Sequence, residues 1–208
     1  MANIKQRAGS VHIRVGGNTQ ETATLVASIP GGKAIGKDKG SATNPTQTPA
    51  LIFTAEIIYM LGNISALTNV KWYLGVPFND TTNPRLQIAE VGEAVLGSNL
   101  LGLQLSNEPD LYSACVLFLY DCSLPFRSPF YLFNSHGHRP ATYGPFDYFG
   151  EFGVMVQAIN NDANIPVKNN LIGPSVATGA WTPEMVWNTG FISSYSSSLA
   201  ALAVEQQV

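Results

Sequence analysis

The chain has 208 residues, which is enough for one ordinary domain, and 45% of them are hydrophobic while 12% are charged. This balance excludes an intrinsically disordered chain. The net charge of −3 and the lack of a basic run interleaved with aromatic residues exclude a nucleic-acid-binding surface. No window approaches the roughly 18 uninterrupted apolar residues of a membrane span, so no membrane partner is expected.

Short apolar runs alternate with helical patterns along the chain. Four runs, each followed directly or within three residues by Gly, Pro or Asn, are typical of strands buried in a parallel sheet: Val11–Val15, Val70–Val76, Leu100–Ser106 and Leu171–Val176. Between them, helical faces are formed by Ile88, Val91 and Val95 and by Phe149, Phe152, Val156 and Ile159. The α/β alternation predicts about four βα units with right-handed crossovers. It fits half of an eight-stranded barrel or a small doubly wound sheet, and the pattern alone leaves both open.

Proline positions predict where helices begin. Thr48-Pro49, Asn83-Pro84 and Thr182-Pro183 each place a capping side chain before a proline at the first helical position. Glu151, Glu184 and Glu205 all fall in helical patterns, and the chain is expected to stop inside a helix. Gly31–Asp38 nearly fits a phosphate-binding loop, but Asp38 stands where a hydroxyl is needed, so we predict a flexible loop.

The most informative segment is Leu103-Gln-Leu-Ser-Asn-Glu-Pro-Asp-Leu-Tyr112. An apolar strand runs directly into Asn107-Glu108-Pro109, which places a carboxylate at the strand's C-terminal end, where barrel enzymes carry catalytic groups. The alternative for the tripeptide alone is a solvated loop with a turn proline. The preceding strand favours the functional interpretation.

Asn-Glu at the end of a fourth strand resembles the large clan of retaining glycosidases built on the (β/α)8 TIM barrel. Together with Leu171-Ile-Gly-Pro-Ser-Val176, the segment resembles fungal members of glycoside hydrolase family 79, which includes β-glucuronidases and heparanases. The resemblance implies that residues 1–208 form a partial TIM barrel, the first half of a catalytic domain, without the family's C-terminal β-sandwich. By this resemblance Glu108 is the general acid/base and Asn107 binds the sugar 2-hydroxyl.

The segment Val11-His-Ile-Arg-Val-Gly-Gly-Asn-Thr-Gln-Glu21 resembles the family's second barrel strand, which lies beneath the sugar subsite. Gly17 then allows close backbone approach and Asn18 offers a hydrogen bond to substrate. A plain strand-to-helix turn is an equal alternative for the glycines. Arg14, in mid-strand, is expected to pair with a carboxylate such as Glu108 or the nucleophile.

Two further stretches need separate explanations. His136 and His138 lack a third ligand at metal spacing, so we predict a loop on the active-site face and no metal site. Residues 114–135 read ACVLFLYDCSLPFRSPFYLFNS, have no regular period and split the expected run from Asp-Leu-Tyr into His-Gly-His. This insert outside the family pattern is either a functional lid or a translated intron. We favour the intron, because its ends are compatible with splice-site codons.

The resemblance implies a retaining hydrolase acting on β-glucuronides or related glycosides, with a carbohydrate substrate and no cofactor. The second carboxylate should end a seventh strand, which the 208 residues are not expected to reach, so the chain is expected to be inactive as given. The competing hypothesis is a non-catalytic carbohydrate-binding or interaction protein. The family is secreted, but the N-terminus has no apolar stretch typical of a signal peptide, so localisation stays open.

Overall fold

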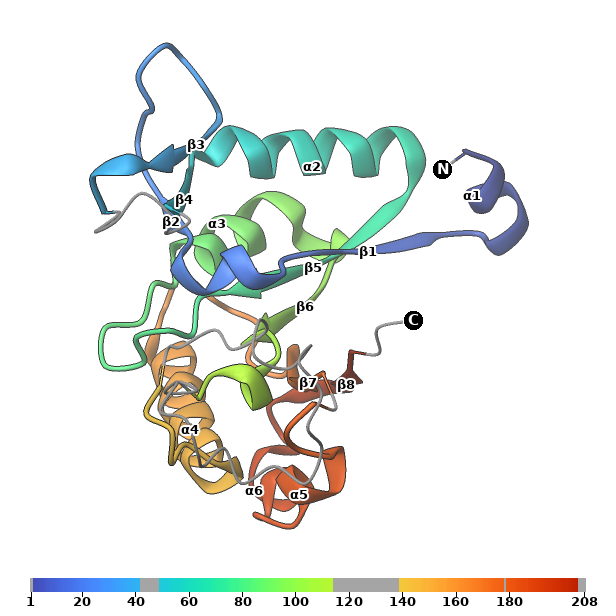
Figure 1. The fold of residues 1–208 in the computed structure, drawn as a ribbon. Coiled ribbons are helices and arrows are strands. Elements are labelled where there is room, and N and C mark those ends of the chain that lie inside the picture. The colour runs from blue at the N-terminus through green and yellow to red at the C-terminus, as the bar shows by residue number, and fades with distance from the viewer. Residues whose placement is uncertain (1, 42–48, 114–138, 178, 206–208) are drawn as a thin grey trace.

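The computed structural model describes residues 2–41, 49–113, 139–177 and 179–205. Its centre is a five-stranded sheet in which neighbouring strands follow the order of the chain (Figure 1). All four neighbouring pairs are parallel. The strands are β1 (Val11–Val15), β5 (Val70–Val76), β6 (Leu100–Leu105), β7 (Leu171–Val176) and β8 (Leu199–Val204). The four predicted strands, their order and their direction are confirmed, and β8 is a fifth.

Helices connect the strands of this sheet. Figure 1 shows α2 and α3 together on one side of β1 and β5, with α4, α5 and α6 beyond β6, β7 and β8. The chain is therefore a mixed α/β fold with crossover helices, as the alternation predicted. In chain order the helices are α1 (Ala2–Ala8), α2 (Ala55–Thr68), α3 (Gln87–Leu96), α4 (Pro145–Asn161), α5 (Pro183–Trp187) and α6 (Phe191–Tyr195).

A second, three-stranded sheet lies between β1 and α2 in the sequence. It consists of β2 (Thr24–Leu25), β4 (Ala50–Phe53) and β3 (Ile35–Asp38), with β4 in the middle. The predicted flexible loop over Gly31–Asp38 is therefore wrong in its second half, because Ile35–Asp38 pairs antiparallel with β4. The predicted helix start at Thr48-Pro49 is wrong too, because the apolar run after Pro49 forms β4 and helix α2 begins at Ala55.

The other two proline signals had different outcomes. Thr182 is the N-cap of α5 and Pro183 its first residue, which confirms that start. Asn83-Pro84 does not start α3, which begins at Gln87. The carboxylate of Asp80 accepts hydrogen bonds from the backbone N–H groups of Thr82 and Asn83, at 3.1 and 3.2 Å, and this local turn holds Asn83 away from the helix.

The apolar core lies between the sheet and its helices. The predicted face of α4 is confirmed, since Phe152, Val156 and Ile159 are buried and Phe149 packs against the same core. The rings of Phe152 and Phe191 lie 4.6 Å apart, centroid to centroid, which joins α4 to α6. On α3, Ile88, Val91 and Val95 are partly buried against this core.

The predicted insert, Ala114–Ser135, lies outside the described residues, as do His136 and His138. Within the described ranges, no helix combines the length and apolar character needed to cross a membrane.

Candidate active site at the carboxyl edge of the sheet

Asn107 and Glu108 follow β6 after a single residue, Ser106, at the carboxyl edge, where the C-terminal ends of the parallel strands meet. Two residues of this turn, Ser106 (φ 73°) and Glu108 (φ 51°), have left-handed backbone conformations that cost side-chain-bearing residues of order 1 kcal/mol each. Neighbouring groups hold the turn. The Glu108 N–H donates to the Ser175 carbonyl at 3.1 Å, and the Asn107 N–H donates to the Tyr112 hydroxyl at 3.0 Å. Such strain is typical of functional turns.

The side chains of Asn18, Asn107 and Glu108 lie together at this edge. The Asn107 amide nitrogen donates to the Asn18 side-chain oxygen at 2.9 Å and to Glu108 Oε2 at 3.3 Å. Asn107 is 1% exposed and Glu108 5% exposed, so both are held rather than free in solvent. Three of the four residues predicted for the site are therefore in direct contact, although they come from opposite ends of a 90-residue span of sequence.

Gly17, the fourth predicted site residue, precedes Asn18 in the turn after β1. Its φ of 103° lies in the region that favours glycine, and an added Cβ would meet no atom within 4 Å. Its N–H donates to Gln20 Oε1 at 3.2 Å. The conformation of the turn, rather than crowding, explains the glycine at this position.

Gln20 connects the turn after β1 to the strands beside it. Its side-chain amide donates to the carbonyls of Val76 and Gln104, each at 3.4 Å, and the residue is 4% exposed. A Cβ on Gly16 or Gly75 would collide with Gln20 Oε1. Those two glycines therefore make room for the glutamine, which the sequence analysis did not single out.

The prediction that Glu205 lies in a helix is wrong. Residues Leu199–Val204 form β8, and Glu205 follows it at the carboxyl edge, where its N–H donates to the Val176 carbonyl at 2.8 Å. The Glu205 carboxylate pairs with Arg14 Nη1 at 2.8 Å. Arg14 is thus paired with a carboxylate, as expected. The partner is Glu205, which the helical pattern had excluded from the candidate site residues. Glu151 and Glu184 lie in α4 and α5, as predicted.

A further carboxyl group, Glu21, lies beneath the Asn107–Glu108 turn and was also missed. Its side chain is fully buried, and neither carboxylate oxygen has a hydrogen-bond partner of normal geometry among the described residues. Burial raises the pKa of Glu21 to about 7, against the lowering effects of the nearby Tyr112 hydroxyl, the backbone N–H groups of Asn107 and Phe78 and the Arg139 cation. Glu21 therefore changes charge near neutral pH.

Asp110 shapes the loop that follows β7. It is 1% exposed, and its two oxygens accept the backbone N–H groups of Ala177 and Gly179, both at 2.8 Å. The carboxylate thereby ties the loop after β7 to the turn after β6. In the sequence, Asp110 is one position of the Asp-Leu-Tyr motif, and no signal distinguishes it from a solvated loop residue.

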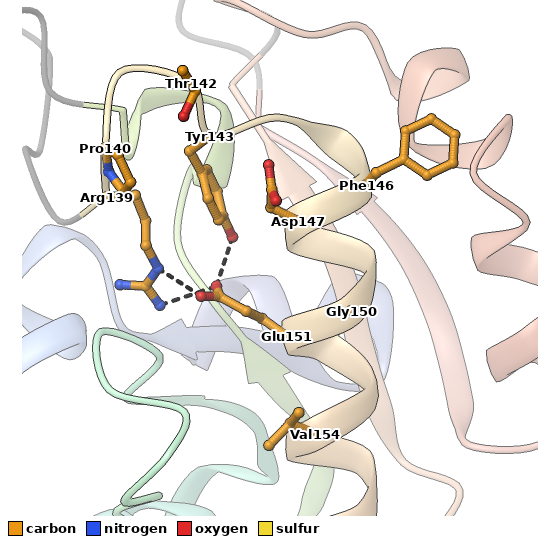
Figure 2. A pocket seen from close by; sticks show the side chains of 9 residues that line it. All are labelled: Arg139, Pro140, Thr142, Tyr143, Phe146, Asp147, Gly150, Glu151 and Val154. Carbon is orange, nitrogen blue, oxygen red and sulfur yellow. Dashed lines mark hydrogen bonds and ion pairs between the residues drawn. The ribbon is translucent and has the colours of Figure 1, made fainter.

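A hollow of about 520 Å³ lies beside the first turns of α4 (Figure 2). Figure 2 shows the Glu151 carboxylate between Arg139 and the hydroxyl of Tyr143. Both oxygens are engaged, by Arg139 Nε at 2.8 Å and Nη2 at 3.0 Å and by the Tyr143 hydroxyl at 2.7 Å. This carboxylate ties Arg139 and Tyr143, which precede α4, to the helix itself. Among the described residues, no three His, Cys, Asp or Glu side chains are grouped as metal ligands.

Comparison with solved structures finds the same architecture in a 4-O-α-L-rhamnosyl-β-D-glucuronidase from Fusarium oxysporum 12S, solved as a complex with Rha-GlcA. The TM-score is 0.63 at 18% sequence identity. The fold resembles that of a glucuronidase. The match covers 97% of this chain and 38% of the glucuronidase, so this chain spans well under half of that protein. No protein-family model matches the sequence. No curated protein matches it either.

Proposed function

We propose that this chain is part of the catalytic barrel of a retaining glycoside hydrolase of family 79 that acts on β-glucuronides or related glycosides. The observation that carries the proposal is the contact of Asn18, Asn107 and Glu108 at the carboxyl edge of a parallel sheet. The fold shared with a glucuronidase supports it. Residues 1–208 then supply five strands of a TIM barrel.

In this proposal Glu108 is the general acid/base. Protonated, it gives its proton to the glycosidic oxygen as the bond from that oxygen to the anomeric carbon breaks, while a second carboxylate forms a bond to that carbon. Ionised, it then takes a proton from the water that displaces this carboxylate. Asn107 binds the sugar 2-hydroxyl, and Gly17 and Asn18 form the floor of the subsite.

The second carboxylate is proposed to lie outside these 208 residues. A retaining pair requires two carboxyl groups about 5–5.5 Å apart. Glu205 lies at the same carboxyl edge of the sheet as Glu108. In the chain of hydrogen bonds from one carboxylate to the other, the side chains of Arg14 and Asn107 intervene. The charge of Glu205 is matched by Arg14 and its oxygen accepts from Gln104. We therefore assign Glu205 no bond-forming role.

The acid/base role is tested in a complete, correctly spliced enzyme that contains this segment. Glu108→Gln removes the proton donor while keeping the shape of the side chain. Loss of kcat/KM is expected to be at least a hundredfold on substrates with poor leaving groups and smaller on activated aryl β-glucuronides, which need less protonation. Glu184→Gln, an exposed carboxylate in α5, is the control and should leave both rates unchanged. Equal losses on the two substrate types would contradict the role.

Residues 114–135 remain proposed to be a translated intron, with a functional lid as the alternative. Sequencing the transcript across this segment decides between them, because a spliced message would join Ser113 to His136. The alternative function is a non-catalytic carbohydrate-binding protein, since the same three polar side chains suit sugar hydroxyls. Saturable binding by a complete, correctly spliced protein that never hydrolyses the sugar would favour it.

A further inference from the structure

Both the backbone and the side chain of Glu205 are fixed at the carboxyl edge. The backbone N–H bonds to the Val176 carbonyl at 2.8 Å, so the chain leaves β8 in a set direction. The carboxylate receives hydrogen bonds from Arg14 Nη1 at 2.8 Å and from Gln104 Nε2 at 3.0 Å. About a quarter of the side chain is exposed, 24%, so the pair with Arg14 is partly shielded from water.

Arg14 shares its guanidinium among three acceptors. Nη1 faces Glu205, while Nη2 donates to the Asn107 side-chain oxygen and, at 3.3 Å, to Gln20 Oε1. The guanidinium is planar and rigid, so a charged partner at Nη1 also sets the plane in which Nη2 points. Among these partners only Glu205 carries a charge, and charge-assisted hydrogen bonds are the stronger ones.

The orientation of the Asn107 side-chain amide decides whether its NH2 group or its oxygen faces Glu108. Its oxygen accepts from Arg14, so its NH2 group faces Asn18 and Glu108. The flipped amide would place the NH2 group against the Arg14 cation and the carbonyl oxygen against the Glu108 carboxylate. Both contacts would be repulsive, so a fixed Arg14 selects one amide orientation.

We propose that Glu205 is a positioning residue, which holds Arg14 in place and through Arg14 directs the Asn107 NH2 group toward Glu108. The inference deepens the proposed function, because it matters for chemistry only if Glu108 is the acid/base. It stands on geometry that can be measured without turnover. Glu205 thus acts on a catalytic group two strands away without touching it.

The test compares the 208-residue chain with its Glu205→Gln variant by NMR of the Arg14 guanidinium and Asn107 side-chain amide. Glutamine preserves size and can still hydrogen-bond, but it removes the charge. Proton exchange at the Arg14 guanidinium is expected to become about tenfold faster or more, because the variant loses the charge-assisted hydrogen bond that protects these protons. The two Asn107 amide protons are expected to shift and to lose their distinct protection. Glu184→Gln, which removes an exposed carboxylate in α5, should change neither signal.

A second variant covers the case in which Glu205→Gln does not fold. Glu205→Asp keeps the charge with one methylene less reach, and smaller changes of the same two signals are expected. Unchanged Arg14 and Asn107 signals in whichever variant folds would overturn the inference. Binding of p-nitrophenyl β-D-glucuronide, followed in parallel, tests the proposed function separately. Its absence in a complete, correctly spliced protein counts against the sugar site, while the NMR result on the 208-residue chain still decides the role of Glu205.

Discussion

The enclosed carboxyl of Glu21 should make the stability of the protein depend on pH. Its pKa is about 7 in the folded chain, against 4.5 for an ordinary glutamate, because burial disfavours the charged form. The raised value means that the stabilising contribution is fully present below about pH 4.5 and is lost as pH rises through 7. A difference of this size corresponds to roughly 3 kcal/mol between the two ends of the window.

Glu21→Gln, a neutral side chain of the same shape, is expected to remove this dependence. Urea unfolding at intervals from pH 4.5 to 8.5 should show the variant nearly equal to the unmodified chain at the acid end. At the alkaline end the variant should be more stable by roughly 2–3 kcal/mol. Glu184→Gln, at an exposed site, should run parallel to the unmodified profile and slightly below it, because the Thr182 hydroxyl lowers the pKa of Glu184 and the ionised form is present across this window. Parallel profiles for Glu21→Gln and the unmodified chain would mean that Glu21 stays ionised when buried.

At the level of strands, the junction of β6 and β7 depends on a glycine. An added Cβ on Gly102 would lie 2.8 Å from the Asn170 carbonyl oxygen and 2.7 Å from Ile172 Cδ1. That carbonyl accepts a hydrogen bond from the Leu103 N–H at 2.9 Å, so it cannot move away from the added Cβ without weakening this bond between the two strands. Gly102→Ala is expected to lower the unfolding free energy by roughly 1–3 kcal/mol.

Gly62→Ala is the matched control for this change. Gly62 lies in α2, and its nearest atom would be Val95 Cγ1 at an ordinary 3.5 Å. Alanine favours the helix by up to about 1 kcal/mol over glycine, so this variant should be neutral or more stable. Chemical denaturation of both variants at one pH checks the pair. A loss of stability confined to Gly62→Ala would reverse the assignment of the crowded position.

The strands were predictable because burial on both faces leaves a short apolar run that ends in turn residues. The same signal was present at Leu199–Val204, where an apolar run is followed by Glu205, much as β6 is followed by Ser106 and then Asn107-Glu108. Its alanines favoured a helix locally, and pairing with β7 outweighed that preference. Likewise Pro49 suits a helix start, but the apolar run after it forms β4, which pairs with β3.

Within the candidate site, the sequence identified the residues that end strands and missed those that connect strands. Asn107 and Glu108 stand beside a clear strand, so their place at the edge followed from order alone. The role of Gln20 depends on which backbone carbonyls its amide reaches across the sheet, and that of Glu21 on the burial of its carboxyl beneath the strand ends. Such contacts depend on register and twist, which a single sequence does not contain.

For the molecule as a whole, we predict no measurable hydrolysis of an aryl β-glucuronide by the 208-residue chain. The proposed mechanism needs a nucleophile beside Glu108, and Glu205 is joined to it only by way of intervening side chains in the contacts described above. A continuous colour assay with p-nitrophenyl β-D-glucuronide measures this, with Glu108→Gln and Glu205→Gln as companions. Turnover by the unmodified chain that Glu108→Gln abolishes would contradict the prediction and would mean that a second carboxylate lies within the 208 residues.

The order of the sheet has a consequence for any strand that joins it. Among the described residues, β1 and β8 are its two outermost strands, and both run in the same direction. On β8, Leu202 and Val204 are 46% and 48% exposed. An added strand that continues the parallel ladder must run the same way at either edge, and one that pairs with β8 would lie beside these two residues. A strand that joins through a further βα unit would keep the direction of β1 and β8, because its crossover helix returns the chain to the same end of the sheet.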